Sequence, residues 1–527
     1  MKPAVQGALS GLLLLSCAGG GSRSPSREMM RAYAEPQGFE RFETTEGPFI
    51  TNEFDYIADN PFLRTKDNPL STFSIDVDTA GYGIARSYIN NRMMPPRSSV
   101  RIEELINYFD YDYLPPDPDD ERPFALHVEI GLCPWNTPRL LARIGIKAKE
   151  FPPGERPKVN LVFLLDVSGS MNEPNKLPLL KKAMKGLVER LGPGDRAAIA
   201  VYAGAAGTVL PPTSCDDKRR IYDALTKLEA GGGTAGGAGI RLAYDLAQAY
   251  FDPAAVNRVI LCTDGDFNLG VSNRAELLDL IAGKARTGVY LTVLGFGMGN
   301  YRDGTLKQLA AKGNGNYGYI DTIEEAEKML GEELEAALIT VARDVKVQVE
   351  FNPRAVGAYR LIGYENRVLR QEDFRDDRVD AGDIGAGHRV TAFYELILPD
   401  DPSLADIPAP DALKYAPPAP EGGAAPFSDE LFTVNARYKP PEGNDQETRL
   451  LSFPVKAPGR ISGASPDFAF AAAAAAFGLL LRDSPYKGGA DYGLVLSLAR
   501  AGAGADPHGY RRGFIKLAEA AEALSRK

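Results

Sequence analysis

The sequence predicts an α/β protein with a doubly wound, mostly parallel sheet, flanked by a β-rich, sandwich-like unit and a C-terminal helical segment. Three observations predict this fold class. Apolar strand patterns alternate with amphipathic helix patterns over residues 159–343, which is typical of a parallel sheet. After Asp344 the apolar residues recur at every second position, the period of antiparallel strands. From Pro466 onward the period is helical again.

The start of the chain is typical of an exported lipoprotein. An apolar run over residues 7–15 follows a short basic start and is too brief to span a bilayer, as in a signal peptide. The run leads into Leu-Leu-Ser-Cys, ending at Cys17, which resembles a lipobox. The resemblance implies a lipid anchor at Cys17 in the cell envelope, and Ala18 after it indicates the outer membrane if the cell has one. A secreted protein cleaved nearby is the alternative.

The first flanking unit combines helix and strand patterns. Four carboxylates at Asp76, Asp78, Glu103 and Glu104 raise the question of a second metal cluster, but we interpret them as solvated or capping groups. A hairpin candidate in this unit is too small to be stable alone, so we expect its strands to pair with those after Asp344. The predicted elements are a strand at 72–78, helices at 80–91 and 99–109, and hairpin strands at 124–132 and 140–148.

The α/β region and the segments after it have predicted elements in regular order. A short strand at 208–210 follows its predecessor after only a few residues, so it must run antiparallel. The other α/β strands are predicted at 197–202, 257–263, 290–296 and 317–321, and the helices at 176–191, 218–228, 238–250, 274–286 and 324–342. Later strands are predicted at 346–351, 359–364, 388–398, 432–438 and 448–456, and helices at 467–482, 492–501 and 509–524.

One stretch organises the α/β region. Residues 161–165 are all apolar, as in a central strand covered on both faces, and the strand ends in Asp166-Val-Ser168-Gly-Ser170. A second apolar strand ends at Asp264. Ligands collect at the carboxyl ends of parallel strands where the winding direction reverses, and hard oxygen ligands suit Mg²⁺, Mn²⁺ or Ca²⁺. Asp, Ser and Gly are also ordinary turn formers, so the pentapeptide alone is equally consistent with a plain turn.

These motifs resemble those of the von Willebrand factor type A (VWA) domain with its metal-ion-dependent adhesion site (MIDAS). Asp-x-Ser-x-Ser, a Thr at 234 after a glycine run, and Thr-Asp-Gly at 263–265 occur in the family's order. The flanks at 71–80, 100–104, 107–111, 359–367 and 468–483 resemble those of bacterial VWA lipoproteins of unassigned role.

The resemblance implies a site that binds one divalent cation, with Mg²⁺ favoured over Mn²⁺ or Ca²⁺. An Asp or Glu of a partner protein would complete the coordination. Asp266 is a further candidate ligand, although a solvated turn carboxylate is the interpretation we favour. Because we expect Asp166 to face solvent on a loop, its replacement should spare the fold. The metal ligands implied by the resemblance are Asp166, Ser168, Ser170, Thr234 and Asp264.

Composition excludes several function classes. A formal net charge of -10 and a pI near 5.2 disfavour a nucleic-acid partner, which needs a basic face. The four cysteines lack metal-type spacing, and Cys262 within a strand indicates a buried, inert thiol.

Two glycine-rich motifs resemble the spacing of a dinucleotide-binding loop but stand in the wrong context. The motif at 231–236 follows a predicted helix, and the motif at 313–318 precedes a predicted strand. A dinucleotide site needs strand, glycines and then helix, so we predict no nucleotide.

The sequence offers few residues that could act in catalysis. His127, His388 and His508 are isolated and lie outside the α/β region, and no hydrolase motif occurs. We therefore predict a non-enzymatic binding module. One alternative is an accessory subunit of a metal-insertion or AAA-type remodelling complex, but an exported protein would have no access to the ATP that such complexes use. The other is a metal-dependent hydrolase, but the sequence offers no general base beside the predicted metal ligands.

The predicted domain boundaries follow these composition and period changes. They are a signal peptide at 1–17, a flexible tether at 18–55, an N-terminal flanking domain at 56–150, a VWA domain at 157–343, a β-rich flanking domain at 344–460 and a helical segment at 461–527.

Overall fold

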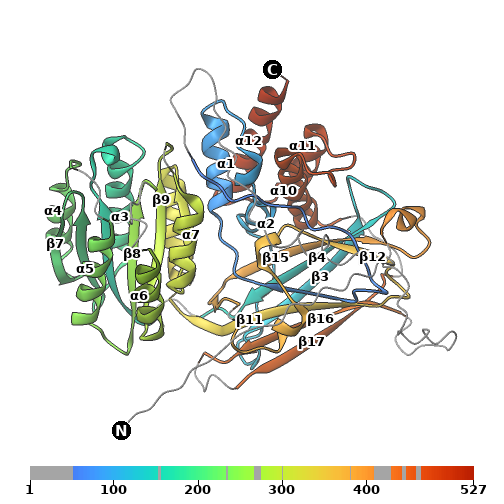
Figure 1. Ribbon diagram of the computed structural model, residues 1–527, viewed down its shortest axis with the longest axis horizontal. Coiled ribbons are helices and arrows are strands. Elements are labelled where there is room, and N and C mark those ends of the chain that lie inside the picture. Colours follow the sequence, from blue (N-terminus) through green and yellow to red (C-terminus); the bar gives the residue numbers. More distant parts are fainter. Residues whose placement is uncertain are drawn as a thin grey trace, which may run out of the picture. The chain divides into compact units, whose positions relative to one another are not determined.

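The computed structural model of the protein describes most of the chain after the predicted tether. The described residues are 52–151, 156–232, 236–265, 274–299, 301–336, 338–379, 381–408, 429–441, 447–458 and 464–526. The predicted signal peptide, the lipobox and nearly all of the predicted tether lie outside these ranges. Within them the strands form three sheets (Figure 1).

The first sheet is the doubly wound, mostly parallel sheet that the sequence predicts. Its strand order is β10-β9-β8-β5-β6-β7, so the winding reverses between the adjacent strands β5 and β8. All neighbours are parallel except β7, which runs antiparallel to β6. The strands are β5 Lys158–Asp166, β6 Arg196–Tyr202, β7 Ala206–Ser214, β8 Ala255–Thr263, β9 Val289–Phe296 and β10 Tyr317–Ile320.

Helices cover both faces of this sheet, as the unbroken apolar pattern of β5 requires. Leu161 and Phe163 pack into a core with the α3 side chains, whereas Val162 and Leu164 pack into a second core with those of α5. The helix α1, Ala80–Asn90, comes from the first flank and also packs into the second core. The α/β helices are α3 Leu177–Arg190, α4 Lys218–Thr226, α5 Gly236–Ala249, α6 Arg274–Arg286 and α7 Asp303–Lys312.

The prediction of a single helix at 324–342 is wrong for the second half of that range. The chain forms α8 Ile323–Glu327, a π-helical turn at Lys328–Glu333 and a short α9 at Leu334–Ala336, and strand β11 already begins at Thr340. Val341 and Val345 belong to the core between two β-sheets. Burial of these side chains in a distant core outweighs local helix propensity, which is worth less than ~1 kcal/mol per residue.

Two antiparallel sheets form the sandwich-like unit that the sequence predicts. Their orders are β1-β12-β15-β4-β3 and β13-β2-β11-β16-β17, with β14 paired to β11. Both sheets contribute to one core, in which the rings of Phe351 and Tyr359 stack at 4.0 Å. The strands are β1 Leu63–Arg64, β2 Leu70–Ser74, β3 Phe124–Leu132, β4 Leu140–Ala148, β11 Thr340–Phe351, β12 Ala358–Ile362, β13 Val368–Leu369, β14 Ile384–Gly385, β15 Arg389–Ile397, β16 Glu430–Lys439 and β17 Arg449–Lys456.

The strands of the two flanks pair with each other, as expected from the small size of the hairpin. β4 of the first flank pairs with β15 of the second, and β2 pairs with β11. In Figure 1 the cyan strand β4 lies beside β15. The α/β region is therefore inserted between two segments of chain that share both sheets of the sandwich.

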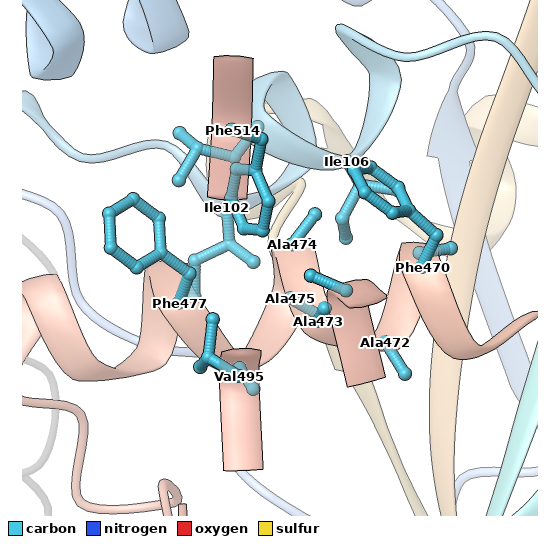
Figure 2. Packing of buried hydrophobic residues seen from close by; sticks show 14 of the residues in the cluster. Ile102, Ile106, Phe470, Ala472, Ala473, Ala474, Ala475, Phe477, Val495 and Phe514 are labelled. Carbon is cyan, nitrogen blue, oxygen red and sulfur yellow. The ribbon is translucent and has the colours of Figure 1, made fainter. Parts of the chain in front are cut away.

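The three predicted C-terminal helices are present as α10 Pro466–Arg482, α11 Tyr492–Ala501 and α12 Tyr510–Ser525. Figure 2 shows the alanines of α10 and the side chain of Phe514 packed with Ile102 of α2, Ile102–Asn107. Ala471 to Ala476 are fully buried, and such small side chains let α2 approach closely. No helix among the described residues is long and apolar enough to cross a membrane.

Candidate metal centre

Asp166 is the last residue of β5 and the buried anchor of the candidate site. Its Oδ1 accepts a hydrogen bond of 2.8 Å from the Ser168 amide, and its Oδ2 accepts one of 3.1 Å from the Tyr202 hydroxyl and one of 3.4 Å from Thr263. Asp166 is 0% exposed, so the expectation of a solvent-facing carboxylate is wrong. Burial raises the pKa of Asp166, and hydrogen bonds from Ser168 partly oppose that increase.

The two serines lie side by side in the turn that follows β5. Ser168 precedes a one-turn helix, Gly169–Asn172, and its Oγ lies 3.1 Å from the Oγ of Ser170. Ser168 is buried, whereas Ser170 is exposed. The turn therefore presents two adjacent hydroxyls at the carboxyl edge of the sheet, one of them open to solvent.

Asp264 follows β8, the strand that pairs in parallel with β5. It is 6% exposed, and its charge contributes to the raised pKa of Asp166. Gly265 has a φ of +89°, and a Cβ there would lie 2.5 Å from the ring of Tyr301. Only glycine suits this turn, which fixes the direction in which the chain leaves Asp264.

Thr234 and Asp266 lie outside the described residues, so the structure does not place these two candidates. The chain up to Gly232 is described, and Gly231 and Gly232 lie against the serine turn. The carbonyl of Gly232 accepts a hydrogen bond of 3.2 Å from the Gly169 amide, and the Gly231 amide donates one of 2.7 Å to the Val167 carbonyl. The glycine-rich segment is thus anchored beside Ser168 and Ser170.

Sequence reasoning missed a basic residue in this cluster. The Nζ of Lys176 donates hydrogen bonds of 3.1 Å to Oδ2 of Asp264 and 3.0 Å to the carbonyl of Ser170. It also missed Tyr202 and Thr263, whose hydroxyls orient Asp166. No sequence signal distinguishes these residues, because a tyrosine ending a strand or a lysine preceding a helix is ordinary.

The residues fit a divalent cation of the hard, oxygen-preferring kind. Two carboxylates and two hydroxyls meet at one edge, and the ammonium of Lys176 already stands in as a cation against Asp264. In the described part of the chain, no three His, Cys, Asp or Glu side chains gather as a metal-binding group. A metal ion at this edge would therefore depend on the serine hydroxyls as well as on the carboxylates.

The carboxylates of the first flank form a different kind of cluster. Oε2 of Glu104 accepts a hydrogen bond of 2.7 Å from the Gly81 amide in the first turn of α1. The capping interpretation is therefore confirmed for Glu104. Asp78, Glu103 and Glu104 are buried, so the solvated interpretation is wrong for them. Asp78 and Glu104 both pair with Lys307.

A separate cleft of about 840 Å³ lies between the α/β sheet and the sandwich. Of the candidate metal ligands that the structure describes, none lines it. Several of its charged side chains pair with one another, as Lys147 does with Glu150 and Arg367 with Asp76.

Cys262 in β8 is buried, and burial raises the pKa of its thiol. The prediction of a buried thiol at this position is confirmed.

Comparison with known families identifies the chain. The model of the von Willebrand factor type A domain matches residues 160–332, a von Willebrand factor model matches residues 48–143, and the model of the C-terminal part of YfbK matches residues 336–524. The uncharacterized protein YfbK of Escherichia coli strain K12 is 41% identical over 483 residues, which cover 90% of this chain and 82% of that protein. The chain belongs to the YfbK family.

The recognised VWA domain and the doubly wound fold are thereby confirmed for this YfbK family member. The uncharacterized protein sll0103 of Synechocystis is 32% identical over 184 residues, covering 35% of this chain and 43% of that protein. A von Willebrand factor type A structure from Catenulispora acidiphila is 18% identical, covers 77% of this chain and 91% of its own, and has a TM-score of 0.40.

Proposed function

We propose that this YfbK family member is a membrane-anchored, divalent-metal-dependent protein-binding module. Its MIDAS captures an acidic side chain of a partner protein for adhesion or scaffolding. The observation that carries the proposal is the convergence of Asp166, Ser168, Ser170 and Asp264 where the winding of the sheet reverses. The membership of a VWA family supports it, because these domains commonly bind divalent metals in protein interactions.

The chemistry of the site favours capture of an anion. Asp166, Ser168, Ser170, Asp264 and, by family resemblance, Thr234 would hold the ion, with Mg²⁺ favoured over Mn²⁺ or Ca²⁺. The two carboxylates neutralise a doubly charged ion, and the hydroxyls are neutral ligands. A bound ion would supply an electrophilic centre for an Asp or Glu of the partner. The hydroxyls of Tyr202 and Thr263 hold the Asp166 carboxylate in its orientation.

Binding is favoured over catalysis at this site. The histidines lie in other parts of the chain, with His127 in β3 and His388 and His508 just before β15 and α12. A serine nucleophile needs an adjacent base, which these positions do not supply to Ser168. The hydroxyls of Ser168 and Ser170 are therefore better explained as ligands.

The proposed place of action is the cell envelope. Lipidation of Cys17 would hold the protein at a membrane, the outer one in a cell that has two. This part of the proposal rests on the sequence, because Cys17 lies outside the described residues. The predicted tether of roughly 30 to 40 residues would let the binding domain reach ~30–35 Å from the membrane surface.

A crosslinking pull-down from intact membranes tests the proposal. The parent chain should capture a partner in Mg²⁺ and lose it in excess EDTA. Asp166→Asn, which keeps hydrogen-bonding capacity but removes the charge, should lose capture even with Mg²⁺. Asp245→Asn on the exposed face of α5 is the matched control and should capture like the parent. Capture that persists in EDTA would overturn the proposal.

A further inference from the structure

Lys176 lies inside the candidate metal centre. Its Nζ is 3.1 Å from Oδ2 of Asp264 and 3.0 Å from the carbonyl oxygen of Ser170. The side chains of Lys176 and Asp264 are only 6% and 5% exposed. Lysine is rarely buried unless it is paired, so this ammonium is held by its contacts with the cluster.

The protein provides a slot for the stem of this lysine. Lys176 immediately precedes α3, and its stem passes Gly297 in the segment that follows β9. Gly297 has a φ of +71°, and a Cβ there would lie 2.2 Å from Cε of Lys176. A larger residue at 297 would exclude the lysine in this position. Glu173 is also near, at 3.7 Å, but its side chain is 59% exposed, so water screens that contact.

We propose that Lys176 is an internal cation that competes with the divalent ion for Asp264. The inference rests on the proposed function, because it takes the cluster to be a metal site. A divalent ion bound to Asp264 would repel an ammonium on the same oxygen, so metal entry displaces Nζ. The stem of lysine is flexible, and rotations about its bonds move the ammonium without a change in the backbone.

This competition makes tight metal binding at the site depend on the presence of the acidic partner. Without metal, Lys176 offsets part of the charge of Asp166 and Asp264, so the cluster tolerates the two close carboxylates. With metal, two positive charges from the ion and one from Lys176 face two carboxylates, which leaves a net positive charge. An anionic side chain of a partner is then attracted more strongly than by the ion and its carboxylates alone. Lys176 therefore weakens metal binding alone and favours binding of metal and acidic partner together.

Calorimetric titration of the purified full chain with Mn²⁺ tests the competition. Lys176→Met keeps a stem of similar length and removes the charge, and it should bind Mn²⁺ about tenfold more tightly or better, the size of effect typical of groups around a metal ligand. Lys176→Arg keeps the charge and should bind within a few-fold of the parent. Lys185→Met, exposed on the same helix, matches the change in net charge and should leave affinity unchanged.

Thermal melting provides a second measurement, which compares the stability of the variants with and without metal. In EDTA, Lys176→Met should melt at a lower temperature than Lys185→Met, because the two carboxylates lose their internal cation. Mn²⁺ should then raise its melting temperature by more than it raises that of the parent. If Lys176→Met does not fold, Lys176→Gln takes its place in both measurements.

The outcomes separate this inference from the proposed function. Equal or weaker Mn²⁺ affinity in Lys176→Met, with clear binding by the parent, overturns the inference and leaves the metal site intact. Absence of Mn²⁺ binding by the parent and by every variant overturns the metal site itself and the inference with it. Tighter binding by Lys185→Met to the same extent would show a general charge effect and would also overturn the inference.

Discussion

Nζ of Lys307 lies 2.9 Å from Oε1 of the buried Glu104, and this largely buried ion pair joins the inserted α/β sheet to the first flank. Lys307 belongs to α7 and Glu104 to α2. Lys307 also lies 3.4 Å from Oδ2 of Asp78, and Arg101 pairs with Asp303 nearby. The contacts hold the α/β sheet against the flank through charges that are removed from water.

Lys307→Met should destabilise the protein strongly. The change removes the cation that Asp78 and Glu104 share, but Asp78 keeps Arg367 and Glu104 keeps Arg101 as partners. We therefore expect a loss towards the lower end of the ~3–5 kcal/mol that breaking a buried pair costs. Lys312→Met at the exposed end of the same helix should cost less than about 1 kcal/mol. Denaturant unfolding of the two variants checks the prediction, and equal midpoints would contradict it.

Divalent ions should stabilise the folded protein. A ligand that binds only the folded state raises its stability by about 2.7 kcal/mol at a concentration of one hundred times its dissociation constant. The melting temperature of the parent should therefore rise in Mg²⁺ or Mn²⁺ and return to its starting value in EDTA. Ser168→Ala combined with Ser170→Ala should abolish the shift. A shift of undiminished size in that double variant would place the ion elsewhere.

Cys17→Ala should release the protein from the membrane or leave it unprocessed. A lipid chain contributes ~0.8 kcal/mol of membrane affinity for each buried CH₂, so its loss removes the proposed anchor. Membrane fractionation and intact mass measure the two effects. Ser16→Ala leaves the cysteine in place and serves as the comparison. Unchanged fractionation together with unchanged mass for Cys17→Ala would reject lipidation.

His388 should make the fold less stable in mild acid. Desolvation of the half-buried imidazole in the wall of the cleft, reinforced by the charge of Arg389, lowers the pKa of His388 from 6.5 to about 4. Between these values the unfolded chain binds a proton that the folded chain does not, so stability falls as the pH falls from 6.5 towards 4. His388→Gln should reduce the loss of unfolding free energy between pH 7 and pH 5 by up to ~2 kcal/mol.

Denaturant unfolding at the two pH values measures that difference. Only the difference between parent and variant is diagnostic, because buried carboxylates titrate in the same range. Burial raises the pKa of Asp78 to about 6 and that of Glu365 to about 7, and both carboxyls act in the opposite direction. Identical pH dependence in parent and His388→Gln would contradict the assignment to His388.

The sequence by itself determined the layout of the fold and the location of the candidate site. The unbroken apolar run before Asp166 predicts a strand buried on both faces, and the run before Asp264 predicts a second one. Side chains at the ends of adjacent parallel strands must share one edge, which is why local patterns placed Asp166, Ser168, Ser170 and Asp264 correctly at that edge. Their binding of a metal ion stays a prediction.

Only the tertiary structure decided which residues complete that edge and how the flanks attach. Lys176 meets Asp264 across 88 residues of sequence, and Lys307 meets Glu104 across 203. The helix predicted to run to residue 342 gives way to strand β11, which pairs with β2 and β16. Local propensity carries no information on such contacts, because their energy comes from burial and pairing between segments that meet only when the chain has folded.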